Sequence, residues 1–155
     1  MGFSIIGLLI GISILIPNIL FIIFPPKNVP EKLKDAGIIF TSLERIGEVG
    51  CLFILAISQD KYQNFNIDIW FVLMVICILI YYSLWIRYVA KGHEFSLAFK
   101  PLYFIPIPMA VFPVLAFAFA SLWGKSIYLA FIVILLAIGH FTNSWHTYKV
   151  ILKSK

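Results

Sequence analysis

DIWFVLMVICILIYYSLWIRYVA, at residues 68–90, contains 18 consecutive residues without a charged side chain, between Asp68 and Arg87. An α-helix needs about 20 predominantly apolar residues to cross the hydrocarbon core of a bilayer. We therefore expect this stretch to form a membrane-spanning helix.

The same apolar character recurs along the whole chain, of which 62% is hydrophobic and 12% charged. A soluble domain carries about 25% charged residues. The composition therefore excludes a soluble enzyme, a secreted disulfide module and a free nucleic-acid-binding protein. It predicts one all-α domain over residues 1–155, a polytopic membrane bundle of five transmembrane helices at about 3–24, 36–58, 68–90, 101–123 and 126–151.

The lysine and arginine residues predict the orientation of these five spans. Nine of them fall in alternate connections and the C-terminal tail, against two in the remaining loops. The nine are Lys27, Lys32, Lys34, Arg87, Lys91, Lys100, Lys149, Lys153 and Lys155, and the two are Lys61 and Lys125. Cytoplasmic loops carry the excess of basic residues. We expect an N-terminus outside and a C-terminus in the cytoplasm, in a multi-pass protein of a bacterial inner membrane that contacts membrane lipids and binds no nucleic acid.

Ionisable side chains inside a span are the strongest functional signal in this sequence. Glu44, Arg45 and Glu48 fall within residues 36–58, and each costs about 2.5–3.5 kcal/mol or more at the centre of a bilayer. Glu44 and Glu48 share one helical face with Arg45 at its edge. That face must contact other helices or a wet cavity.

This cluster has two interpretations. Arg45 pairs with one glutamate and the cluster fixes helix packing, or the second carboxylate carries a proton in a binding or catalytic site. Two carboxylates against one guanidinium leave a surplus negative charge, which needs a proton, water or another donor. Glu48 lies deeper from the cytoplasmic end than Glu44, so it is the first choice for the proton carrier.

Other spans place polar groups at a similar depth. His140 and Asn143 share a face of residues 126–151, where His140 is either a hydrogen-bonded packing residue or a proton partner or ligand contact. Tyr81 and Trp85 share a face of residues 68–90 that is either an aromatic packing face or a pocket wall, and Tyr82 lies at the same depth.

Prolines are expected to interrupt two spans. Pro106 and Pro108 break residues 101–123, and Pro17 lies beside Asn18 in the first span, which also contains a Gly7–Gly11 GxxxG pattern typical of close helix packing. Together the spans predict a polar pocket that opens to the cytoplasm or inner leaflet. Its candidate residues are Glu44, Arg45, Glu48, His140, Asn143, Asn18, Tyr81, Tyr82 and Trp85.

No metal or cofactor is expected. Three histidines and two cysteines show no metal-binding spacing, and no phosphate-binding loop or nucleophile elbow occurs. Cys51 and Cys77 fall inside predicted helices, where small packing residues are the ordinary interpretation.

Four blocks carry a resemblance: LERIGEVG (43–50), YYSLWIRY (81–88), IPIPMAVFP (105–113) and IGHFTNSW (138–145). They resemble blocks of small five-helix membrane proteins of low-GC bacteria. The resemblance implies the architecture and no activity.

Three functions remain open. The first is binding or transport of a small amphiphile or ion. The second is a membrane enzyme that acts on a lipid or isoprenoid by acid/base chemistry, with Glu48 and His140 in these roles. The third is a subunit of a homo-oligomer or of a larger membrane complex, whose charges pair with its partner.

Overall fold

The computed structural model describes residues 2–30, 33, 36–62 and 65–153. Within these residues the chain is helical with connecting turns and contains no β-strand, which confirms the predicted all-α class. The elements in chain order are α1 (Ile5–Leu15), the 3-10 helix η1 (Ile16–Ile19), α2 (Leu20–Ile23), α3 (Ile38–Ile57), α4 (Gln59–Tyr62), α5 (Ile69–Ala90), α6 (Phe95–Ala98), α7 (Pro108–Trp123) and α8 (Ile127–Lys153).

Within the part of the chain that the structure describes, three helical stretches are long and apolar enough to cross a membrane, as judged by their length and composition. They are Ile5–Ile23, Ile69–Ala90 and Ile127–Lys153, of 19, 22 and 27 residues. The two other long helices differ from them in one respect each. α3 has 20 residues but contains Glu44, Arg45 and Glu48, and the apolar α7 has only 16 residues. The apolar helices suggest a membrane-associated protein.

The helix expected over residues 101–123 begins only at Pro108. Leu102 and Ile105 each donate a backbone N–H to the other's carbonyl at 3.0 Å, which closes a tight turn in place of helix. Pro106 and Pro108 have no backbone N–H to donate, so helical hydrogen bonding cannot continue toward residue 101. The prolines therefore unwind this segment rather than kink it.

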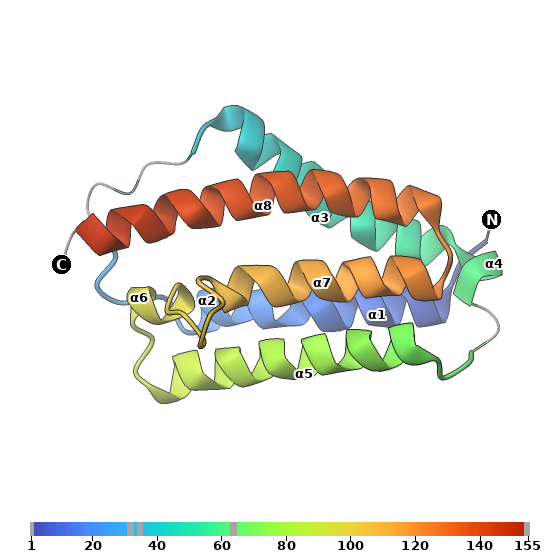
Figure 1. Ribbon diagram of the computed structural model, residues 1–155, viewed down its shortest axis with the longest axis horizontal. Coiled ribbons are helices and arrows are strands. Elements are labelled where there is room, and N and C mark those ends of the chain that lie inside the picture. Colours follow the sequence, from blue (N-terminus) through green and yellow to red (C-terminus); the bar gives the residue numbers. More distant parts are fainter. Residues whose placement is uncertain (1, 31–32, 34–35, 63–64, 154–155) are drawn as a thin grey trace.

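Hydrogen bonds tie the chain together at two opposite ends of the bundle (Figure 1). At the first, which we call the Lys27 end, Lys27 N–H donates to the His93 carbonyl at 2.8 Å and Phe95 N–H donates to the Lys27 carbonyl at 3.0 Å. At the second, the Tyr62 end, the Tyr62 hydroxyl donates to the Ala120 carbonyl at 3.1 Å. Burial raises the pKa of Tyr62, so its hydroxyl keeps the proton that it donates. The long helices run alternately from one of these ends to the other (Figure 1).

Basic side chains gather at the Lys27 end. Lys27, Arg87, Lys91, Lys100, Lys149 and Lys153 lie on segments that meet there, whereas Lys61 and Lys125 lie at the Tyr62 end. Lys32, Lys34 and Lys155 lie outside the described residues.

The helices form three rows, with α3 and α8 on one side, α1 and α7 in the middle and α5 on the other side (Figure 1). Small residues allow the closest approaches. Gly7 and Gly11 of α1 lie against Leu55 and Leu52 of α3, so a Cβ on Gly11 would come within 2.7 Å of the Leu52 side chain. This is the close packing that the GxxxG pattern predicts.

The first span is broken at Pro17, as its sequence predicts, and α5 compensates for the break. Pro17 cannot donate to the Ser13 carbonyl, and the Tyr82 hydroxyl donates to that carbonyl at 2.8 Å. The Tyr88 hydroxyl similarly donates to the Phe24 carbonyl at 3.1 Å, where α2 ends. A backbone group freed in an apolar environment needs such a partner.

Candidate functional site

Glu44 connects α3 to α8 through both of its carboxylate oxygens. His140 Nδ1 lies 2.6 Å from Oε1, and Asn143 Nδ2 donates to Oε2 at 2.5 Å. The Glu44 and His140 side chains are only 20% and 22% exposed. Because an ionised carboxylate only accepts hydrogen bonds, this contact places a proton on His140 Nδ1.

Gly139 makes this contact possible. A Cβ at Gly139 would meet the Glu44 backbone nitrogen and the Phe40 carbonyl oxygen. One turn away along each helix, a Cβ at Gly47 would lie 2.6 Å from Leu136 Cα. Backbone therefore meets backbone at this crossing, and the side chains that follow Gly139 reach across to α3.

Arg45 and Glu48 form a separate ion pair, with Nη1 and Oε2 3.2 Å apart. Arg45 is 76% exposed, so the pair lies toward the outside of the bundle. The three residues of the predicted cluster thus make two separate sets of contacts. Glu48 pairs with the Arg45 guanidinium, and Glu44 accepts hydrogen bonds from two side chains of α8. Glu48 is the first choice from the sequence for the proton carrier, whereas in the structure Glu44 is the carboxylate that contacts His140.

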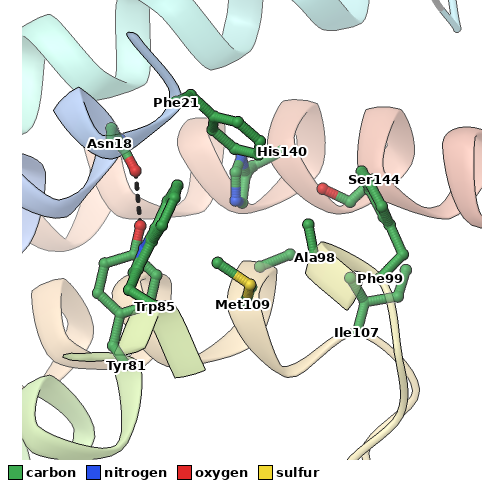
Figure 2. Close-up of a pocket in the computed structure, with 11 residues that line it drawn as sticks. Asn18, Phe21, Tyr81, Trp85, Ala98, Phe99, Ile107, Met109, His140 and Ser144 are labelled. Atoms are coloured by element: carbon green, nitrogen blue, oxygen red, sulfur yellow. Dashed lines mark hydrogen bonds between the residues drawn. The ribbon is translucent and has the colours of Figure 1, made fainter. Parts of the chain in front are cut away.

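His140 also forms part of the wall of a cavity with about 90 Å³ of space for the centres of water-sized molecules. Figure 2 shows its imidazole directed between Phe21, Trp85 and Met109. The cavity is lined by residues from α2, α5, α7, α8, the broken first span and the connection before α7, namely Asn18, Phe21, Tyr81, Trp85, Ala98, Phe99, Ile107, Met109, Ala110, His140 and Ser144. We call it the His140 cavity.

Polar side chains other than His140 also belong to the wall of this cavity. The Tyr81 hydroxyl donates to Asn18 Oδ1 at 2.6 Å (Figure 2). Trp85 is 2% exposed, and its Nε1 has no hydrogen-bond partner of good geometry among the described residues, although Tyr81 lies close enough to interact with it. His140 Nε2 and the Ser144 hydroxyl likewise make no hydrogen bond within the described part of the chain.

A smaller, deeper cavity of about 30 Å³ adjoins the first. It shares Asn18, Tyr81 and His140 with the His140 cavity and adds Glu48 to their polar groups. The remainder of its wall is apolar or proline, from Ile14, Leu15, Pro113, Val114, Phe117 and Leu136. The polar lining is thus limited to one side of this cavity.

The nine candidates fall into three groups. Asn18, Tyr81, Trp85, His140 and Glu48 line the two cavities. Glu44 contacts His140 Nδ1, and Asn143 donates to Glu44. Arg45 and Tyr82 line neither cavity: Arg45 donates to Glu48, and Tyr82 donates to the Ser13 carbonyl.

Sequence reasoning missed the apolar half of the cavity wall. Phe21, Met109 and Ala110 lie in apolar runs without any distinguishing pattern, and Ala98 and Phe99 come from a connection expected to be a plain loop. Proline spacing before Pro108 is the one signal that marks this region as unusual. Among the described residues, no group of three or more His, Cys, Asp or Glu side chains could hold a metal ion.

Comparison of the chain with protein-family models, curated proteins and solved structures finds no match. The site is therefore interpreted from its own geometry. Its central element is an imidazole held by a carboxylate at Nδ1, with its other edge on a cavity between helices.

Proposed function

We propose that this protein crosses a bacterial inner membrane five times, with α3 and α7 as the second and fourth spans. At 1.5 Å per residue, α3 extends about 30 Å, the thickness of the hydrocarbon core, and α7 about 24 Å. The charges of α3 are accommodated, because Glu44 contacts α8 and the long Arg45 side chain can extend toward the headgroups. The lysines of the Lys27 end favour a cytoplasmic position for that end.

Within that bundle we propose that the His140 cavity binds a small amphiphile or ion, for storage or for transport. The observation that carries this proposal is the Glu44–His140 contact of 2.6 Å beside the cavity. Packing alone needs no imidazole whose second nitrogen faces open space. A hydrogen bond from a ligand to this nitrogen would contribute about 1 kcal/mol.

The same contact favours an enzyme as the second candidate. A carboxylate that holds Nδ1 fixes the tautomer in which Nε2 is a free base, which is the arrangement of a general base or a proton shuttle. The substrate would be a lipid or isoprenoid. Turnover distinguishes this candidate from simple binding.

Native mass spectrometry of the protein, extracted gently from its own membrane, tests the binding function. We expect one small molecule of defined mass on the wild type and about tenfold lower occupancy on His140→Gln, because one hydrogen bond to a buried polar group contributes about 1.4 kcal/mol. His146→Gln is the matched control, since His146 lies on the same helix and lines none of the cavities described here. An adduct that persists unchanged on His140→Gln contradicts the proposal. Recovery only in a fixed complex with another polypeptide also contradicts it and supports the subunit alternative.

A further inference from the structure

An apolar groove leads from the His140 cavity to the outside of the bundle between α7 and α8. It has about 150 Å³ of space, and we call it the α7–α8 groove. Its lining residues are Pro106, Ile107, Ala110, Val111, Phe141, Ser144 and Trp145. Ile107, Ala110 and Ser144 also line the His140 cavity, so the two spaces are adjacent.

The unwound segment before α7 explains this opening. α8 continues toward the Lys27 end beyond the point where α7 begins (Figure 1). Instead of a helix that covers α8, the chain forms the turn between Leu102 and Ile105, with Tyr103 and Phe104 at its tip 93% and 91% exposed. Phe141 and Trp145 of α8 are accordingly 38% and 43% exposed along the groove.

The charges around the His140 cavity restrict the head of any ligand. Its lining and that of the deeper cavity contain no lysine or arginine among the described residues, and Glu48 lines the deeper one. An anionic head would be desolvated without a cation to compensate it, at a cost of several kcal/mol. With its Nδ1 protonated, His140 offers an acceptor at Nε2, and the Ser144 hydroxyl both donates and accepts. This set suits an uncharged head that both donates and accepts.

The size of the cavity restricts the head further. About 90 Å³ is well below the 300–1,000 Å³ of pockets for drug-sized ligands. A hydroxyl group with its first few carbons fits this space, whereas the phosphate ester and two acyl chains of a phospholipid do not.

We infer that the site binds a single-chain amphiphile with an uncharged hydroxyl head, its head in the His140 cavity and its hydrocarbon chain passing through the α7–α8 groove into the surrounding leaflet. This inference rests on the proposed binding function and adds the class of ligand and its route. The hydroxyl donates to His140 Nε2 and accepts from the Ser144 hydroxyl. The tail replaces lipid contacts along Val111, Phe141 and Trp145.

Photolabelling in phosphatidylcholine nanodiscs tests the class of ligand. The probes are three C16 chains with the same mid-chain diazirine and an alcohol, a carboxylate or a trimethylammonium head. We expect the alcohol to label peptides 106–111 and 141–145 about tenfold more than either charged probe, the ratio for about 1.4 kcal/mol. Ser144→Ala, which loses the hydroxyl that would donate to the alcohol, should lower labelling by the alcohol by a similar factor.

The route is tested by filling the groove. Val111 lines the α7–α8 groove and not the His140 cavity, so Val111→Trp should reduce alcohol labelling about tenfold. Val111→Phe provides a smaller obstruction should the larger one disturb folding. Val72→Trp is the matched control, a lipid-exposed position on α5 where we expect no change.

The outcomes separate this inference from the proposed function. Equal labelling by the alcohol and the carboxylate would overturn the head-group assignment and leave binding intact. Labelling that neither Val111 variant reduces would overturn the route alone. Failure of every probe to label the wild type, with a native adduct that His140→Gln still retains, would overturn the proposed function itself.

Discussion

At the scale of single residues, Glu44 is the side chain on which the site depends. Each of its oxygens accepts one hydrogen bond from α8, from His140 and from Asn143. Loss of the carboxylate leaves both α8 groups without their acceptor, whereas loss of Glu48 removes one hydrogen bond from the mostly exposed Arg45. The two glutamates, one helical turn apart, therefore differ in importance.

Glu44→Leu should lower the free energy of unfolding by about 2–4 kcal/mol, because it leaves two partly buried donors unpaired. Glu44→Gln keeps one acceptor and should lose about half as much. Glu48→Leu is the control and should cost under about 1 kcal/mol, because it removes one ion pair with a mostly exposed arginine. Unfolding in mixed micelles measures all three. Equal losses for Glu44→Leu and Glu48→Leu would show that the Glu44 contacts to α8 stabilise the protein no more than the Arg45–Glu48 ion pair does.

The sequence predicted that Glu44, Glu48, His140 and Asn143 belong to buried faces, but not which of them meet. Helical periodicity places Glu44 and Glu48 on the same stripe. Which one reaches His140 depends on where α3 and α8 cross, and that point is set by backbone contact at Gly139. A contact between residues 96 positions apart leaves no periodic pattern in one sequence.

At the scale of elements, the broken first span depends on α5. Pro17 removes the donor for the Ser13 carbonyl, and Tyr82 supplies another from a different helix. Sequence reasoning identified the break and assigned Tyr82 to a pocket or packing face, because an aromatic stripe does not reveal what each hydroxyl bonds. Proline and tyrosine thus form one unit across two helices.

A double-mutant cycle tests this unit. Tyr82→Phe should lower the free energy of unfolding by about 1–2 kcal/mol, because it leaves the Ser13 carbonyl unpaired. In a Pro17→Ala background, which restores an N–H to the helix, the same change should cost little. Tyr128→Phe, at an exposed position of α8, controls for loss of a hydroxyl elsewhere. Equal costs in both backgrounds would disprove the coupling.

Gly139 allows the close approach of α3 and α8, and alanine substitutions at Gly139 and Gly50 measure how much stability depends on it. Gly139→Ala forces a methyl group against the backbone of Glu44 and Phe40 and should cost about 1–3 kcal/mol. Gly50→Ala meets only the end of the Ile132 side chain, at 2.8 Å, which can move aside at lower cost. Gly139→Ala should also reduce ligand occupancy in native mass spectra, because it separates Glu44 from His140. Unchanged occupancy would show that the crossing does not position the site.

At the scale of the whole molecule, the composition predicted an all-α chain and the alternating order of its long helices, since apolar runs and turn residues are local signals. The prolines predicted an interruption within residues 101–123, but the start of α7 at Pro108 and the groove beside it depend on how residues 99–107 pack, which hydropathy does not reveal. Among the described residues, three helices have the length and apolarity of a span. α3 carries three charged residues and α7 has only 16 residues, so each would depend on contacts with neighbouring helices to cross. The number of crossings is therefore the property of the whole molecule most in need of measurement.

Single cysteines probed with a membrane-impermeant maleimide count these crossings. Five spans place Lys61→Cys and Ile127→Cys outside, labelled in intact cells, and Lys27→Cys and Lys149→Cys inside, labelled only after the membrane is opened. Cys51 and Cys77 are buried, so the wild-type chain is the unlabelled control. If α3 does not cross, Lys61→Cys will behave like Lys27→Cys. If α7 does not cross, Ile127→Cys will label as an inside position. Since the Glu44–His140 contact joins α3 to α8, failure of α3 to cross would also move the site out of the bilayer and remove the basis for a ligand drawn from a leaflet.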